Sequence, residues 1–331
     1  MGPDRPLRVG IVGFGTMGRK HAASCARIPG VEVVAAVGAD EVEASFIRRA
    51  GLPAFIDTAR MLEEVPLDAI IMAQPPGVRE VAILAAAAAG KALFVEKPLA
   101  LDMATARHYC RAASHVVNAV GFQLRYSPVA ERTRQLIRAR QITQVRTACT
   151  TGYYLRRDVP DWFLQRRHSG GPLLEQAIHM IDMARYLAGE ITHVVGRQHR
   201  LTHANVAECD SEDNSALLFR FASGALGTHL DSCSMTTFNW EVELFGPDWR
   251  LLADFARKRL SGYLGTQTVS EDFPDEDLHL KEMQAFVRAV RTGSRETIRS
   301  DFADAARTLS AVLAGDRSSQ SGCWEFTETL P

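Results

Sequence analysis

Short runs of apolar, often β-branched residues alternate with segments of helical periodicity along the first part of the chain. The apolar runs fall at 7–12, 31–38, 67–76 and 91–100, and helix-like segments between them include 40–51 and 78–90. A continuous apolar run bounded by glycine or proline indicates a strand that is buried on both faces. Such strands, separated by helices, predict a doubly wound α/β domain with a parallel sheet.

Polar and apolar residues alternate in the second part of the chain. The alternating runs are 143–154, 191–201, 214–223, 224–232, 238–246 and 248–254. Apart from 172–188, no long helical segment separates these runs, so they predict an open, largely antiparallel sheet. A helix that begins near Pro128 follows the crossing between the two parts. We therefore expect a Rossmann domain over 1–121 and a second α/β domain over 122–331, with further helices at 277–293 and 301–315.

Composition restricts the class of protein. The 331 residues are 46% hydrophobic and 23% charged with a formal net charge of -1, which suits two globular domains. The sequence has no Lys/Arg-rich run and no apolar run of membrane-spanning length, so we expect neither nucleic acid nor a membrane as a partner. Six scattered cysteines without a C-x-x-C pair indicate reduced thiols and a cytoplasmic protein.

A glycine fingerprint follows the first predicted strand. Gly13, Gly15 and Gly18 form G-x-G-x-x-G at a strand-to-helix junction. The first glycine permits a tight turn, the second lets backbone amides approach a diphosphate, and the third lets the helix pack close to the strand. With the intervening Phe14, Thr16 and Met17, this loop is predicted to hold a dinucleotide at the helix N-terminus.

The choice between NAD and NADP is read at the end of the second strand, where an acid binds the ribose 2′-OH of NAD. Gly38 occupies that place, and Asp40 follows two residues later. Asp40 binds the ribose if the loop curls back, or it caps the next helix. The missing side chain at Gly38 equally leaves room for the 2′-phosphate of NADP, so the sequence leaves the cofactor open.

Three ionisable residues share one face of the segment 172–188. Glu175, His179 and Asp182 stand four and three residues apart, beside an apolar stripe. This spacing suits acid–base chemistry, but it also suits a metal site or a buried network that satisfies the histidine. No second cluster supplies further metal ligands, so no metal is expected.

The order of these motifs resembles the Gfo/Idh/MocA oxidoreductases, the family named for glucose-fructose oxidoreductase, inositol dehydrogenase and a rhizopine-catabolism protein. The motifs are "GFGTMGRKHA", "FVEKPLA", "GFQLRYSPV", "GGPLLEQAIHMIDMARYLAG", "EDNSALLFRFASGALGT" and "AFVRAVRTG". The element with Glu, Lys and Pro and the later element with His and Asp are the most selective. The resemblance implies that the C-terminal helices pack back beside the first domain.

The resemblance also implies roles for individual residues. Lys97 projects toward the nicotinamide, His179 takes or gives the hydroxyl proton, and Glu175 is its acidic partner where many members carry Asp. Residues expected to contact the cofactor besides the fingerprint, Gly38 and Asp40 are Gln74, Pro75, Glu96, Lys97, Gln123 and Arg125. Gln123 departs from the family's usual Asn, which affects its expected contact with substrate.

The segment before the predicted catalytic helix is rich in aromatic residues and arginines. Tyr153 and Trp162 suit stacking on a sugar ring, although a solvated loop with a packed tryptophan fits the pattern equally well. The residues expected to bind substrate are Lys97, Gln123, Tyr153, Trp162, Glu175 and His179.

These inferences predict an NAD(P)-dependent oxidoreductase that acts on a secondary alcohol or ketone of a sugar, cyclitol or related polyol. Two alternatives stay open: a dinucleotide-sensing regulatory protein without catalysis, and a reductase of a dihydrodiol, bilin or imine. The uncovered face of the second predicted sheet would expose apolar area, so we expect a homodimer or homotetramer through that sheet.

Overall fold

The computed structural model describes residues 5–152, 160–206 and 208–329. The chain divides into two compact units, the first formed by residues 1–123 and 277–305 and the second by 124–276 and 306–331. The backbone thus passes between the units at three places, and the helical segment 277–305 belongs to the first unit.

The first unit contains a parallel sheet, as the apolar runs predict. Among the described residues its strands are β1 (Leu7–Val12), β2 (Val31–Val37), β3 (Ala54–Phe55), β4 (Ala69–Met72), β5 (Ala92–Val95) and β6 (Asn118–Val120). They lie in the order β3-β2-β1-β4-β5-β6, and every neighbouring pair is parallel. All four residues of β4 are fully buried, which explains its uninterrupted apolar sequence.

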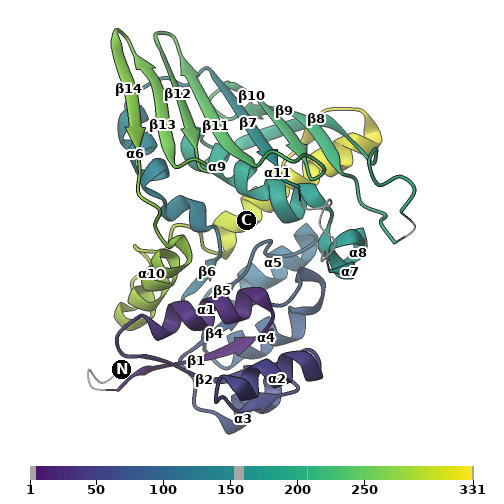
Figure 1. Ribbon diagram of the computed structural model, residues 1–331, viewed down its shortest axis with the longest axis vertical. Coiled ribbons are helices and arrows are strands. Elements are labelled where there is room, and N and C mark those ends of the chain that lie inside the picture. The colour runs from purple at the N-terminus through teal and green to yellow at the C-terminus, as the bar shows by residue number, and fades with distance from the viewer. Residues whose placement is uncertain (1–4, 153–159, 207, 330–331) are drawn as a thin grey trace. The chain divides into compact units, whose positions relative to one another are not determined.

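Helices connect and cover these strands (Figure 1). They are α1 (Thr16–Ala26), α2 (Glu41–Arg49), α3 (Thr58–Glu64), α4 (Glu80–Ala88), α5 (Met103–Ala112), α10 (Leu278–Thr292) and the start of α11 (Phe302–Ser321). Helix α1 packs against α10, while α4 packs against α3 and α5. Helices α2, α3, α5 and α10 each begin after an aspartate whose carboxylate accepts a hydrogen bond from the third following amide, which fixes their starts.

The strand order places a topological switch point between β1 and β4 of the first sheet. Strands β1 and β4 are neighbours, although the chain moves outward from them in opposite directions. Ligands of such sheets bind outside the carboxyl ends of the strands at this switch point. The loops that follow β1, β4 and β5 all leave from that edge.

The second unit contains a mixed, mostly antiparallel sheet, which confirms the predicted fold class. Among the described residues its strands are β7 (Gln144–Thr150), β8 (Ile191–His199), β9 (Asn214–Phe221), β10 (Leu226–Ser232), β11 (Asn239–Gly246), β12 (Trp249–Asp254), β13 (Arg259–Leu264), β14 (Gln267–Asp272) and β15 (Glu325–Phe326). The order is β14-β13-β12-β11-β7-β10-β9-β8-β15, and only β7 and β10 pair in parallel among these described strands.

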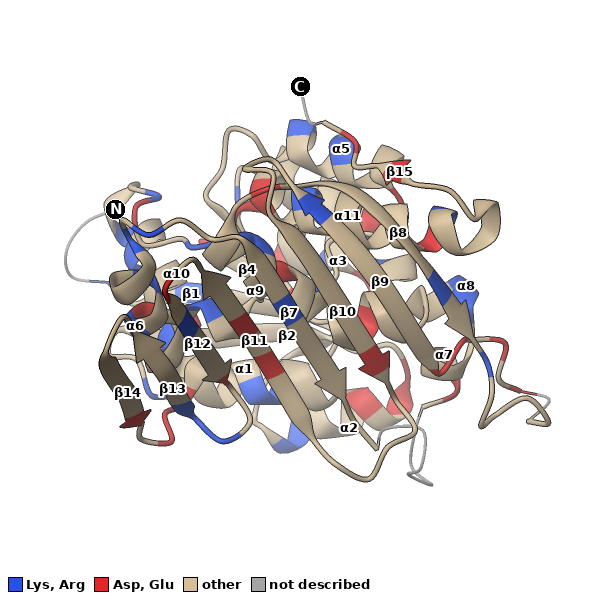
Figure 2. Cartoon of the chain, turned by 90° about the horizontal axis from the view of Figure 1, so that it is seen from above, with Lys and Arg blue, Asp and Glu red and all other residues tan. Residues whose placement is uncertain are grey.

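Helices cover one face of this second sheet. They include α6 (Pro128–Ile137), α9 (Ile178–Ala188) and the continuation of α11, and two short helices, α7 (Asp161–Leu164) and α8 (Arg166–Ser169), precede α9. Helix α9 packs on β7 and β11, and α6 packs on β12 and β13. Figure 2 views the opposite face, where Leu218, Leu226 and Leu230 are 48%, 55% and 58% exposed.

The hairpin β13–β14 lies at 259–272, where no strand was predicted from the sequence. Leu264 pairs with Gln267, so Gly265 and Thr266 form a two-residue turn, and Gly265 has a φ of 58°. Apolar–polar alternation around a glycine-containing pair is a hairpin signal, and the prediction missed it. None of the helices in the described residues has the length and apolar character needed to cross a membrane.

Candidate active site

The glycine loop after β1 has the geometry that the fingerprint predicts. Gly13 has a φ of 86°, and a Cβ there would lie 2.9 Å from the backbone of Ala73 and Gln74. A Cβ on Gly18 would lie 2.0 Å from the carbonyl oxygen of Gly13, so α1 packs on β1 more closely than any side chain permits. Glycine at both positions therefore allows the loop, the strand and the helix to meet.

The start of α1 fits a dinucleotide diphosphate. Gly15 is the N-cap residue and carries no side chain, so it leaves the first amides of α1 to another acceptor. Thr16 and Met17 form the first turn, where the helix dipole favours negative charge. The residues of this loop therefore fit the cofactor predicted from the sequence.

A glutamate that was not among the predicted site residues, Glu43, lies against the glycine loop. Glu43 Oε2 accepts hydrogen bonds from the backbone N–H of Phe14 at 2.9 Å and of Ala39 at 3.0 Å. A Cβ on Gly38 would lie 3.2 Å from the Glu43 Cβ, so the first turn of α2 fills the space beside Gly38. Asp40 caps α2 by accepting from the Glu43 N–H. An acidic residue in the first turn of α2, the helix that follows β2, is the sequence signal by which Glu43 could have been predicted.

Lys97 follows the carboxyl end of β5 and is partly buried. Its backbone N–H donates to Glu96 Oε2 at 3.2 Å, and its peptide bond to Pro98 is cis. Gln74 and Pro75 follow β4 at the same edge of the sheet. The first unit thus gathers the glycine loop, Gln74 and Lys97 at the carboxyl ends of neighbouring strands.

A buried cluster of titratable residues surrounds the Glu96 carboxylate. His21 Nε2 lies 2.6 Å from Glu96 Oε1, and His279 Nδ1 lies 3.1 Å from Glu282 Oε1. Burial favours the protonated form of Glu96, but the hydrogen bond and charge of His21, with the charges of Lys97 and His279, hold its pKa at about 2. Burial and the Glu96 charge raise the pKa of Glu282 well above its usual range. Glu96 is therefore the anion of the cluster, and Glu282 keeps its proton.

The ligand atoms of His21, Glu96 and Glu282 lie within 4.8 Å of one another, the arrangement closest to a metal site in the described part of the chain. Two ligands of one zinc ion are about 3.3 Å apart when each is 2.0–2.1 Å from the metal. The 2.6 Å separation of His21 and Glu96 is shorter, so a shared proton fits this pair and an ion between them does not.

In the second unit, Glu175 and His179 lie on consecutive turns and are both buried. Glu175 belongs to a π-helical turn, Leu173–Ala177, that runs directly into α9 with His179. The Glu175 N–H donates to the Gly171 carbonyl at 2.9 Å. The His179 ring packs on Trp240 with 5.1 Å between centroids. Wide π-turns inside helices are rare and frequently mark functional sites.

Asp182 is hydrogen-bonded to Arg125 and Thr308. Its carboxylate accepts two hydrogen bonds from Arg125, at 2.8 and 2.7 Å, and one from the Thr308 hydroxyl at 2.8 Å. Arg125 also stacks on Tyr186, with its guanidinium 4.7 Å from the ring centroid. The structure thus places Arg125, expected near the cofactor, in a buried ion pair that ties its turn to α9.

A row of polar residues that was not predicted from the sequence crosses the covered face of the second sheet. Asp231 on β10 lies directly beside Ser215 on β9 and Cys149 on β7, and Trp240 on β11 lies opposite Cys149. Burial raises the pKa of Asp231 to about 7. Cross-strand register, which a single sequence does not reveal, brings Ser215, Asp231 and Cys149 into one row with Trp240, whose ring contacts His179.

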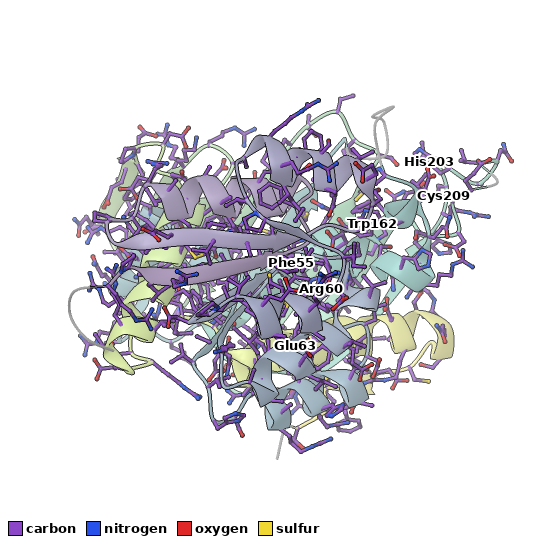
Figure 3. All side chains as sticks on the ribbon, turned by 90° about the horizontal axis from the view of Figure 1, so that it is seen from below. Phe55, Arg60, Glu63, Trp162, His203 and Cys209 are labelled. Atoms are coloured by element: carbon purple, nitrogen blue, oxygen red, sulfur yellow. The ribbon has the colours of Figure 1, made fainter. Side chains whose placement is uncertain are left out.

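Three further residues were predicted to bind substrate: Trp162, Gln123 and Tyr153. Trp162 packs with Phe163, Cys209 and Cys233, and Figure 3 shows it beside Cys209 near the His203 loop. Gln123 begins the short helical turn Gln123–Tyr126 and is partly buried. Tyr153 lies outside the described residues.

Comparison with known proteins gives matches along most of the chain. Residues 7–122 match the family model "Oxidoreductase family, NAD-binding Rossmann fold", and residues 130–251 match "GFO/IDH/MocA C-terminal domain". Myo-inositol 2-dehydrogenase of Thermotoga maritima is 24% identical over 307 residues, which cover 87% of this chain and 89% of that protein. The scyllo-inositol 2-dehydrogenase (NAD(+)) of Bacillus subtilis is 27% identical over 338 residues, 96% of each protein.

A solved structure, a complex of levoglucosan dehydrogenase with NADH, has a TM-score of 0.89 at 22% identity. The match covers 98% of this chain and 100% of that chain. At this identity the likeness supports the fold of both units.

Replacing Glu282 by glutamine tests the protonation of the cluster. Charged groups that face Glu282 are Lys20 and His21 of α1, Glu96 after β5, and Asp277 and His279 at the start of α10. Because the folded pKa of Glu282 exceeds the unfolded value of 4.5, its contribution to wild-type stability is lost as pH rises from 4.5 through the folded pKa. Glu282→Gln removes that loss. The free energy of unfolding of the variant, relative to that of wild type, should therefore rise by up to about 1.4 kcal/mol for each pH unit above 4.5.

Urea unfolding between pH 5 and pH 8 measures this difference, with the exposed Glu63→Gln as the control for losing a carboxylate. A difference that stays constant with pH would show that Glu282 is ionised in the folded protein.

Proposed function

Because the chain belongs to the Gfo/Idh/MocA oxidoreductase family, as its motifs predicted, we propose that it is a dehydrogenase of sugars, cyclitols or related polyols. It transfers hydride between a nicotinamide dinucleotide and a secondary alcohol or ketone. The observation that carries this proposal is Lys97 at the carboxyl edge of a sheet that also bears the glycine loop. The names of the two inositol dehydrogenases support the substrate class.

Different residues of this chain transfer the proton and stabilise the charge that develops. The nicotinamide, when bound, supplies the hydride acceptor. His179 removes the proton of the substrate hydroxyl, and the Lys97 ammonium holds the same oxygen and offsets its developing negative charge. Glu175, one turn before His179, balances the positive charge that the imidazole gains. Trp240 packs on the imidazole and fixes its plane.

We further propose that the cofactor is NAD. The support is Glu43, whose carboxylate lies beside the glycine loop at the end of β2 and also fills the space next to Gly38. A ribose 2′-OH donates to a carboxylate, whereas the 2′-phosphate of NADP faces repulsion from it.

We also propose a homo-oligomer in which the uncovered face of the second sheet packs on the same face of a second copy. Leu218 and Leu226 line a hollow of about 350 Å³ on this face together with Trp324. A self-complementary apolar face suits a two-fold interface.

Our proposed compartment is the cytoplasm, since all six cysteines are free thiols.

The catalytic assignment predicts that Lys97→Ala and His179→Ala each lower kcat by about 10²- to 10⁴-fold, because each removes a placed proton-transfer or charge-stabilising group. NADH affinity, measured by fluorescence titration, should change little in both variants. Turnover is followed at the nicotinamide absorbance band with myo-inositol, scyllo-inositol and D-xylose.

Lys91→Ala is the matched control, because Lys91 lies at the opposite end of β5. It should leave turnover unchanged. Full activity of Lys97→Ala, or an equal loss of NADH binding and turnover, would refute the assigned roles.

The cofactor proposal predicts that Glu43→Gln raises the ratio of kcat/KM for NADP to that for NAD by about tenfold or more, since a repulsion of about 1.4 kcal/mol disappears. Steady-state kinetics with both cofactors measure the ratio. Glu41→Gln, an exposed change in the same helical turn, is the control. An unchanged ratio in Glu43→Gln contradicts the proposal.

The oligomer proposal predicts that Leu218→Glu combined with Leu230→Glu converts the assembly to monomers, because two charges then meet the partner's apolar face. Light scattering at micromolar concentration measures the mass. Ile56→Glu, at a site 84% exposed in the first unit, should leave the mass unchanged. A monomeric wild-type protein contradicts the proposal.

A further inference from the structure

Arg79, which lies immediately before α4, is only 1% exposed. A buried guanidinium is costly to desolvate unless its N–H groups are satisfied, and an apolar side chain of similar size often serves packing better. Burial of Arg79 therefore implies acceptor groups that bind its several N–H donors.

Those partners are backbone carbonyls on both sides of Lys97. Arg79 Nη1 donates to the carbonyl oxygen of Glu96 and, at 2.7 Å, to that of Pro98. Nη2 donates to the Gln74 carbonyl at 2.6 Å. The planar fork of arginine presents several donors in fixed directions, which the single ammonium of a lysine does not reproduce.

The amide side of the same tripeptide is held by the Glu96 carboxylate. The Lys97 N–H donates to Glu96 Oε2, and His21 binds the other oxygen. A Cβ on Gly121 would lie 3.2 Å from Glu96 Oε2, so the end of β6 closes the remaining side. Carbonyls and amide of the tripeptide 96–98 are thus held from two directions.

Arg79 also joins the ends of two neighbouring strands. Gln74 follows β4, and its backbone packs on Gly13 of the glycine loop. The tripeptide 96–98 follows β5, which pairs with β4. The guanidinium therefore links the backbone that packs on the glycine loop to the backbone that bears Lys97.

From these contacts we infer that Arg79 is a positioning residue for Lys97, acting through the carbonyls of Glu96 and Pro98. The inference rests on the proposed function, in which the Lys97 ammonium meets the substrate oxygen. A shift of about 1 Å at a reacting group costs on the order of 10²-fold in rate, so a clamp on this backbone matters for turnover.

The test uses the full chain with NAD and whichever of myo-inositol, scyllo-inositol and D-xylose is the best substrate. Arg79→Met should lower kcat about 100-fold, with the Kd for NADH within about threefold of wild type because diphosphate binding relies on the glycine loop. Arg79→Lys keeps the charge and most of the packing, so it should fold and recover part of the lost kcat. Arg295→Met, which removes another arginine bound to main-chain carbonyls of the first unit, should leave kcat unchanged.

A second readout separates positioning from general stability. In the Lys97→Ala background, Arg79→Met or Arg79→Lys should cause no further fall in kcat, since the group that it positions is gone. The same fold-loss in both backgrounds, or wild-type kcat in Arg79→Lys and Arg79→Met alike, would overturn the inference. Full activity of Lys97→Ala alone would instead overturn the proposed function.

Discussion

The buried carboxylate of Glu96 is the charge on which the first unit depends. A carboxylate is expensive to bury, and it is stable here because His21 and the Lys97 amide both donate to it. His21 comes from α1, the helix whose first turn follows the glycine loop, and Glu282 comes from α10 in the returning segment. One anion therefore joins α1, whose first turn follows the glycine loop, to the strand end that bears Lys97, and Glu282 of α10 lies beside it. The protonated state of Glu282 keeps a second negative charge out of the same space.

In the second unit, a buried ion pair holds the site residues in place. The ion pair between Arg125 and Asp182 is almost fully buried and is completed by the Thr308 hydroxyl, so it fixes α9 to the turn before α6. With α9 anchored at Asp182, the π-turn at its start sets the orientation of Glu175. His179 lies between these two features and packs on Trp240. The buried ion pair thus anchors the helix that bears His179, the proposed acid–base group.

Much of the fold was predictable, because burial on both faces and burial on one face leave different periodicities in a sequence. The continuous apolar run at 67–76 became the buried strand β4, and the alternating run at 214–223 became β9 with one covered and one exposed face. The hairpin β13–β14 was missed, although Gly265 marks its turn. The widened turn at 173–177 has no signature of its own, since the apolar spacing there also fits an ordinary helix.

The sequence by itself determined which groups are available for chemistry: the glycine loop, Lys97 after its strand, and Glu175 and His179 on consecutive turns. It determined them because local conformation and spacing depend on near neighbours in the chain. Only the tertiary structure decided how those groups are supported. Arg79 reaches the carbonyls around Lys97, Glu43 reaches the glycine loop, and Asp182 turns to Arg125. These contacts join residues that are 19, 29 and 57 positions apart, and a buried polar group takes whichever partner packing brings within hydrogen-bond distance.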